Sequence, residues 1–226
     1  MSDKIKSIFT RYFFGTLGLA FVAAGVAFSI KSDLGTAPIS CPPYVLSLKG
    51  WLSVGEFTAL MHFLFILFQV ALLRKSFKWK YLMQIPAAIV FGALTDLFIW
   101  TFDFIVADTY FERLAYMLVS LILTATGVSL EVRSKAWMVA GEMTVAALAE
   151  VSGKKFSTVK IFFDITLVAI AAAISFLLFS NLLGDGHYNV IREGTIVSAV
   201  FTGLLMKVTD KFIDRFIGKT VIDRYE

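Results

Sequence analysis

The stretch GTAPISCPPYVLSL, residues 35–48, is mostly apolar and contains three of the four prolines in the chain. It is shorter than the roughly 20 residues that a membrane-spanning helix needs, and each proline lacks the backbone N–H that a continuous helix would use. Irregular backbone survives at membrane depth only where protein or a water-filled cavity satisfies its polar groups. We therefore expect a re-entrant loop with a short half-helix, in which Pro38, Pro42 and Pro43 are structural.

Longer apolar runs surround this stretch. Of the 226 residues, 58% are hydrophobic and 17% are charged, so the chain has too few polar residues to cover a water-exposed surface. The runs predict an all-α polytopic membrane protein with about six transmembrane helices in one membrane domain, residues 1–226, and a second short re-entrant segment at 139–150. The predicted spans lie near Tyr12–Ile30, Phe57–Leu73, Leu82–Phe102, Leu114–Leu130, Ile161–Phe179 and Gly194–Val208. Lys207 and Asp210 make the last span the weakest.

The basic residues indicate which side of the membrane each loop faces. With both short segments re-entrant, one side holds 17 of the 21 lysines and arginines, and the other side holds only Lys31, Lys49, Arg113 and Arg192. Cytoplasmic loops carry the excess of positive charge, so both termini are expected in the cytoplasm. We expect the basic, amphipathic tail 207–226 to lie on the inner leaflet rather than on nucleic acid.

A shift of 102 residues superposes the two halves of the chain. It aligns Gly25-Val26 with Gly127-Val128, Lys31 with Arg133, and Ser32 with Ser134. Both halves then share the order of span, basic-Ser turn, short segment and span, although few residues are identical and chance similarity between apolar sequences is the alternative. With three spans each, repeats near 1–106 and 110–210 would insert in opposite orientations.

Three segments are similar to a known family. They are Lys31-Ser32-Asp33-Leu34-Gly35-Thr36 with the Pro-rich stretch after it, Gly92-Ala93-Leu94-Thr95-Asp96, and Arg192-Glu193-Gly194-Thr195. With them, nearly the whole chain resembles the YczE/YyaS/YitT group of bacterial membrane proteins. The resemblance implies a bacterial plasma-membrane protein and no particular substrate. The family pattern often has asparagine where this chain has His62, which argues against a proton-carrying role for His62.

Ionisable residues inside apolar spans are costly and are expected to face the protein interior. Asp96 in the third span is a candidate for binding a solute or ion, or for a structural hydrogen bond to a neighbouring helix. The shift of 102 pairs His62 with Asp164, and these side chains either approach each other near the midplane or extend separately to water. Arg192 and Glu193, just before the last span, resemble a cap of that span and are expected to pair locally or with another outer loop.

The two short segments supply further polar candidates. Glu142 lies opposite Ser40 in the repeat register, and it would bind a cation or proton in a cavity-lining half-helix but would only be solvated in a loop. The turn before the first short segment contributes Ser32, Asp33, Gly35 and Thr36. Their side chains and flexible backbone suit either a helix cap or a ligand site.

The remaining inference concerns function. The chain has no phosphate-binding loop, no cysteine and histidine spacing for a metal, and no nucleophile motif, so we expect neither an enzyme nor a cofactor. The inverted repeat and the intramembrane polar residues favour a secondary transporter or permease for a small solute or ion. The alternative is a non-transporting membrane subunit that assembles with or regulates a partner protein. The sequence is compatible with a homo-oligomer.

Overall fold

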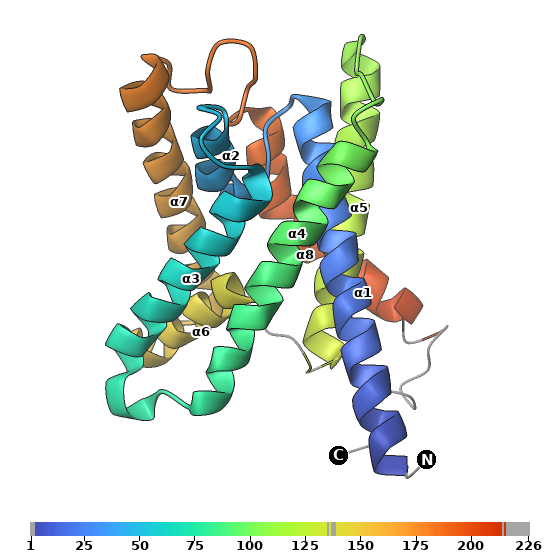
Figure 1. The fold of residues 1–226 in the computed structure, drawn as a ribbon, viewed down its shortest axis with the longest axis vertical. Helices are drawn as coiled ribbons and strands as arrows, with labels where there is room; N and C mark the ends of the chain where they lie inside the picture. The colour runs from blue at the N-terminus through green and yellow to red at the C-terminus, as the bar shows by residue number, and fades with distance from the viewer. Residues whose placement is uncertain (1–2, 135, 137–138, 214, 216–226) are drawn as a thin grey trace.

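The computed structural model describes residues 3–134, 136, 139–213 and 215, and in this part of the chain the regular structure is helical apart from one isolated bridge between Gly184 and Asn189. Figure 1 shows the arrangement of the helices. The α-helices are α1 (Asp3–Ser32), α2 (Cys41–Ser47), α3 (Val54–Leu73), α4 (Gln84–Thr101), α5 (Tyr110–Ser134), α6 (Ala140–Ser152), α7 (Phe156–Phe179) and α8 (Glu193–Ile213). Short 3-10 helices lie at η1 (Pro38–Ser40), η2 (Arg74–Ser76) and η3 (Trp79–Met83). Most of the predicted tail 207–226 lies outside the described residues.

Five helical segments are long and apolar enough to cross a membrane. They are Phe9–Ser32, Val54–Ser76, Trp79–Thr101, Tyr110–Ser134 and Thr158–Phe179, which match the first five predicted spans. Their outer faces expose large apolar side chains; Phe162 and Leu177 of α7, for example, are 64% and 81% exposed. A protein surrounded by water rarely leaves such a surface uncovered. Composition and surface together support the class of polytopic helical membrane protein.

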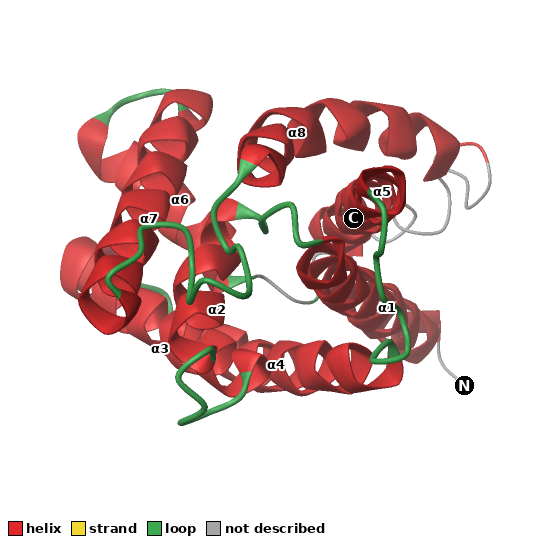
Figure 2. Ribbon diagram, turned by 90° about the horizontal axis from the view of Figure 1, so that it is seen from above, coloured by secondary structure: helices red, strands yellow, loops and turns green. Residues whose placement is uncertain are grey.

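The sixth predicted span corresponds to α8, which is helical but is not among those five segments. Lys207, Asp210 and Lys211 lie in its second half and shorten its apolar part. The helix packs mainly along α5, and Figure 2 shows it separated from α7 when the molecule is seen from above. A sixth crossing therefore stays a prediction.

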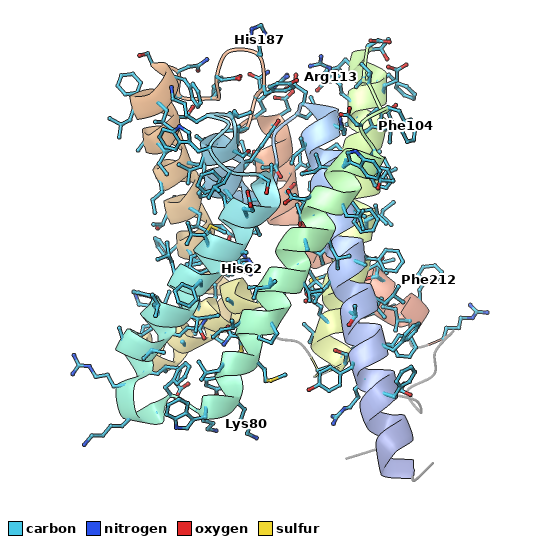
Figure 3. All side chains as sticks on the ribbon, viewed as in Figure 1. His62, Lys80, Phe104, Arg113, His187 and Phe212 are labelled. Carbon is cyan, nitrogen blue, oxygen red and sulfur yellow. The ribbon has the colours of Figure 1, made fainter. Side chains whose placement is uncertain are left out.

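The long helices alternate in direction between two ends of the molecule. In Figure 1 the upper end holds the α4–α5 and α7–α8 connections, and the lower end holds the start of α1 and the α3–α4 connection. Figure 3 places Arg113 and His187 at the upper end and Lys80 at the lower end. This separation follows the division of the loops that was predicted from the basic residues.

The two short segments fold as short helices at opposite ends. Helix α2 has seven residues and lies near the upper end, between the end of α1 and the start of α3, whereas α6 has 13 residues and lies in the lower half (Figure 1). Pro38 begins η1, while Pro42 and Pro43 lie in the first turn of α2, where a helix does not use their missing N–H groups. Each short helix therefore leads the chain back to the end of the molecule at which the preceding long helix finished, which is the upper end for α2 and the lower end for α6.

Helices α1 and α5 pack closely because glycines face each other along the contact. A Cβ atom on Gly127 would lie 2.6 Å from the carbonyl oxygen of Gly18, and a Cβ atom on Gly25 would lie 3.0 Å from that of Ser120. The Ser120 hydroxyl donates a hydrogen bond to the carbonyl of Gly25 at 2.7 Å. Small residues of this kind let helix backbones approach in membrane proteins.

Candidate functional site

The predicted turn between α1 and η1 forms a hydrogen-bonded cluster at the upper end. Ser32 is buried and its hydroxyl donates to the carbonyl of Ser29, whose hydroxyl lies 2.7 Å from that of Thr36. The Thr36 amide donates to the carbonyl of Val190. Gly35 has a φ of +94°, and a Cβ atom there would lie 2.6 Å from the Thr195 hydroxyl, so only glycine fits this position.

Asp33, in the turn after α1, joins three segments of the chain at this end: its own turn, the start of α5 and the α7–α8 connection. Its carboxylate accepts hydrogen bonds from the Arg113 guanidinium at 2.7 Å and from the backbone N–H of Asn189 at 2.9 Å. Arg192 donates to the Asp33 carbonyl oxygen and pairs through its other nitrogens with Glu193, which is the local pairing that we expected. These contacts favour the structural interpretation of the turn, since the Asp33 carboxylate already has its partners. We call Asp33, Arg113, Asn189 and Arg192 the upper lock.

Two other predicted residues of this end, Asp96 and Ser40, differ in their partners. Asp96 of α4 accepts hydrogen bonds from the Ser53 hydroxyl at 2.5 Å and from the Gly55 amide at 2.7 Å. It therefore holds the first turn of α3 against α4, as the interhelical alternative expected. Ser40 is buried before α2, and its side chain makes no capping hydrogen bond.

His62 and Asp164 do not bond to each other, although the repeat register pairs them. The buried imidazole of His62 stacks on the Phe91 ring, with 5.5 Å between ring centroids. Asp164 forms an ion pair with Lys160, one turn earlier on α7, at 2.7 Å. In the described part of the chain, no hydrogen bond or ion pair joins either residue to Asp33, Asp96 or Glu142, so the predicted candidates do not form one cluster.

A second polar region lies in the lower half, around the first turns of α6. The two N–H groups of the Gln69 side chain are shared among three acceptors at 3.0–3.1 Å, which are the Gln84 side-chain oxygen, the Ala140 carbonyl and the Thr144 hydroxyl. Gln84 donates back to Gln69, and both glutamines are fully enclosed. These bonds tie α3, α4 and α6 together, and they are the interhelical bonds typical of polar residues in membrane helices.

Glu131, one turn before the end of α5, is the residue of this region that sequence analysis missed. It is 5% exposed, and Glu142 of α6 is a second acidic residue whose charge acts on it. The predicted span ended at Leu130, because the following Glu-Val-Arg sequence is typical of a loop. A signal was present nonetheless, since continuing the helix by one turn places Glu131 on the same face as Gly127.

A cavity of about 410 Å³ opens beside this region at the lower end. Its lining combines basic and aromatic side chains with the enclosed Gln84. The lining residues are Tyr12, Lys78, Lys80, Tyr81, Met83, Gln84 and Ala136. Gln84, which is 1% exposed, forms part of the wall of this cavity.

Comparison with known proteins gives a family and no activity. A family model described as a family of unknown function, DUF6198, matches residues 9–211. The match covers most of the chain, and the chain therefore belongs to this family. No curated protein and no solved structure matches it.

Proposed function

We propose that the chain is a secondary transporter for a small solute or ion, built from two inverted repeats in a bacterial plasma membrane. The observation that carries the proposal is the reciprocal contact between α1 and α5. Under the shift of 102 residues, position 18 corresponds to 120 and position 25 to 127. Gly127 packs on Gly18, and Gly25 packs on Ser120, so each half makes the same contact with the other. Such reciprocity is expected of segments related by a twofold axis.

Further pairs of features support the repeat. In the first half, the Ser32 hydroxyl donates to the carbonyl three residues earlier and accepts from the Leu34 amide. In the second half, the Ser134 hydroxyl makes the same two bonds, to Glu131 and from Ala136. Helix α2 packs on α7, while its counterpart α6 packs on α3. Shared local chemistry and exchanged packing partners are difficult to obtain from chance similarity between apolar sequences.

The two ends differ in the way that alternating access requires. At the upper end the hydrogen bonds of Asp33 hold the chain closed, whereas a cavity opens at the lower end. The halves differ as well, because α3 packs along α4 but α7 makes no comparable contact with α8 in the described residues. We infer that the arrangement is open to the cytoplasm, with the lower end inside.

Orientation is tested by labelling in a Cys41→Ala background. Lys78→Cys and His187→Cys place single thiols at exposed positions of the lower and upper ends. A membrane-impermeant thiol reagent added to intact cells is expected to label position 187 and to reach position 78 only after the cells are opened, because basic loops stay in the cytoplasm. Labelling of position 78 from outside would contradict this orientation.

Transport is tested with purified protein in proteoliposomes. A panel of radiolabelled amino acids, sugars, carboxylates and inorganic ions is presented from outside, and accumulation above that of protein-free vesicles is expected for at least one of them. The test variant is a Gln69→Leu, Gln84→Leu double substitution, which keeps side-chain size and removes the polar network beside the cavity. This variant should lose most of the flux. Absence of flux across the panel, together with stoichiometric co-purification of another membrane protein, would favour the subunit alternative.

A further inference from the structure

The side chain of Glu131 lies in an unusual position for a carboxylate. It is 95% buried, and its Oε1 atom has no hydrogen-bond partner in the described part of the chain. Its Cγ atom lies against α1, where a Cβ atom on Gly18 would come within 3.0 Å of it. The glycine therefore leaves the space that Glu131 fills. A charged group buried in this way is costly unless something neutralises it.

Among the residues that the structure describes, no neighbour of Glu131 supplies that neutralising charge. Glu142 in the first turn of α6 adds a second negative charge nearby, and the Gln69 amide is already bonded to other acceptors. Arg133, two residues along α5, pairs with Asp210. Arg11 lies two turns before Gly18 on the same face of α1, but it forms no ion pair with Glu131, and its buried Nε atom has no hydrogen-bond partner among the described residues.

The residue at the corresponding position of the first half, Ser29, has hydrogen-bond partners for its side chain. Position 131 corresponds to Ser29, whose hydroxyl donates to the carbonyl of Val26 and lies 2.7 Å from the Thr36 hydroxyl. The second half thus has a carboxylate where the first has a satisfied hydroxyl. A purely structural position would not need the charge, because an uncharged side chain of this size would fill the space at lower cost.

We infer that Glu131 and Glu142 form a binding site for a small exchangeable cation, a proton or an alkali-metal ion, which enters from the lower end. Two carboxylates suit such a cation, and the described residues contain no group of three or more potential ligands for a transition metal. Its role as the coupling ion or the transported ion rests on the proposed transport function. Binding itself is measurable without transport.

The test measures the thermal unfolding temperature of the purified full-length protein in detergent. N-methyl-D-glucamine chloride, whose cation is too large for the site, is exchanged at constant ionic strength for NaCl, KCl or LiCl, and in a separate series the pH is lowered without metal cations. A ligand that binds only the folded state stabilises it. At a concentration of ~100 times its dissociation constant, one of these cations should therefore raise the unfolding temperature by roughly 5 °C. A response to pH alone identifies the cation as a proton.

Three variants make the test specific. Glu131→Gln should abolish the response and leave the cation-free protein at least as stable as the wild type, because the charge is lost and the shape is kept. Glu142→Gln should weaken the apparent affinity at least about tenfold, which also covers the case in which Glu131→Gln fails to fold. Glu150→Gln, an exposed glutamate on the same helix, should respond like the wild type.

The inference is overturned if the wild type responds to none of these cations, or if Glu131→Gln and Glu142→Gln respond like Glu150→Gln. A protein that binds the cation in this assay but shows no flux in proteoliposomes would retain the site and contradict the transport proposal. Flux in proteoliposomes without a cation response in the unfolding assay would support the transport proposal and contradict the cation site. The two failures are therefore distinguishable.

Discussion

Gly127→Leu is expected to lose most of its folded, membrane-inserted protein. A Cβ atom at this position would lie 2.6 Å from the Gly18 carbonyl oxygen and 2.7 Å from the Val22 amide nitrogen. Both are backbone atoms of α1, so relief requires the two helices to separate along the contact that holds α1 and α5 together. Overpacking a close contact typically destabilises a protein by about 1–3 kcal/mol. A leucine pressed against backbone atoms should cost about 3 kcal/mol, the largest value of that range.

Size-exclusion chromatography and thermal unfolding of the detergent-solubilised protein measure this effect. Leucine is a better helix former than glycine, so any loss reflects packing rather than helix propensity. Gly203→Leu is the matched control, because a Cβ atom at Gly203 of α8 meets no atom within 4 Å. The control should keep the wild-type yield. Normal yield and stability for Gly127→Leu would show that the contact between α1 and α5 is less close than described.

The sequence predicted the class of the fold because apolar runs and prolines act locally. Runs of about 20 apolar residues need a membrane, and the three prolines of residues 35–48 forbid a continuous helix whatever the rest of the chain does. Both features therefore carried over to five long apolar segments and to the short helix α2. The first residues of α3 and α7, Val54 and Phe156, are 102 residues apart, whereas those of α4 and α8, Gln84 and Glu193, are 109 apart, so the repeat stays a prediction.

The partners of polar residues could not be predicted in the same way. Asp96 and Glu131 both lie on long helices, yet Asp96 accepts two hydrogen bonds from the start of α3 and Glu131 Oε1 accepts none in the described part of the chain. The difference depends on which helix lies opposite, and that is a property of tertiary packing. Asp33 had the same ambiguity, because its partners Arg113 and Asn189 lie 80 and 156 residues away along the chain.

Asp33→Asn is expected to open the upper end, and the single cysteine of the chain reports the change. Cys41 is fully buried beneath the turn, with its thiol 3.8 Å from the Val190 carbonyl oxygen. Asparagine tolerates the φ of +49° at position 33, so the backbone is retained while the ion pair with Arg113 is lost. That pair is only 20–31% exposed, and loss of about 1.4 kcal/mol would raise the open population roughly tenfold.

The rate at which a membrane-impermeant thiol reagent modifies Cys41 in whole cells measures this opening, with about a tenfold increase expected. Asp103→Asn is the control at the same end. Lys31, through its hydrogen bond, lowers the pKa of the Asp103 carboxyl, so that carboxyl is ionised at neutral pH, but the Asp103 side chain is 83% exposed. Water replaces such a partner readily, and the Cys41 rate should change less than about twofold. Equal rates in the two variants would show that the upper lock does not hold this end closed, because breaking it would then matter no more than breaking a solvated pair.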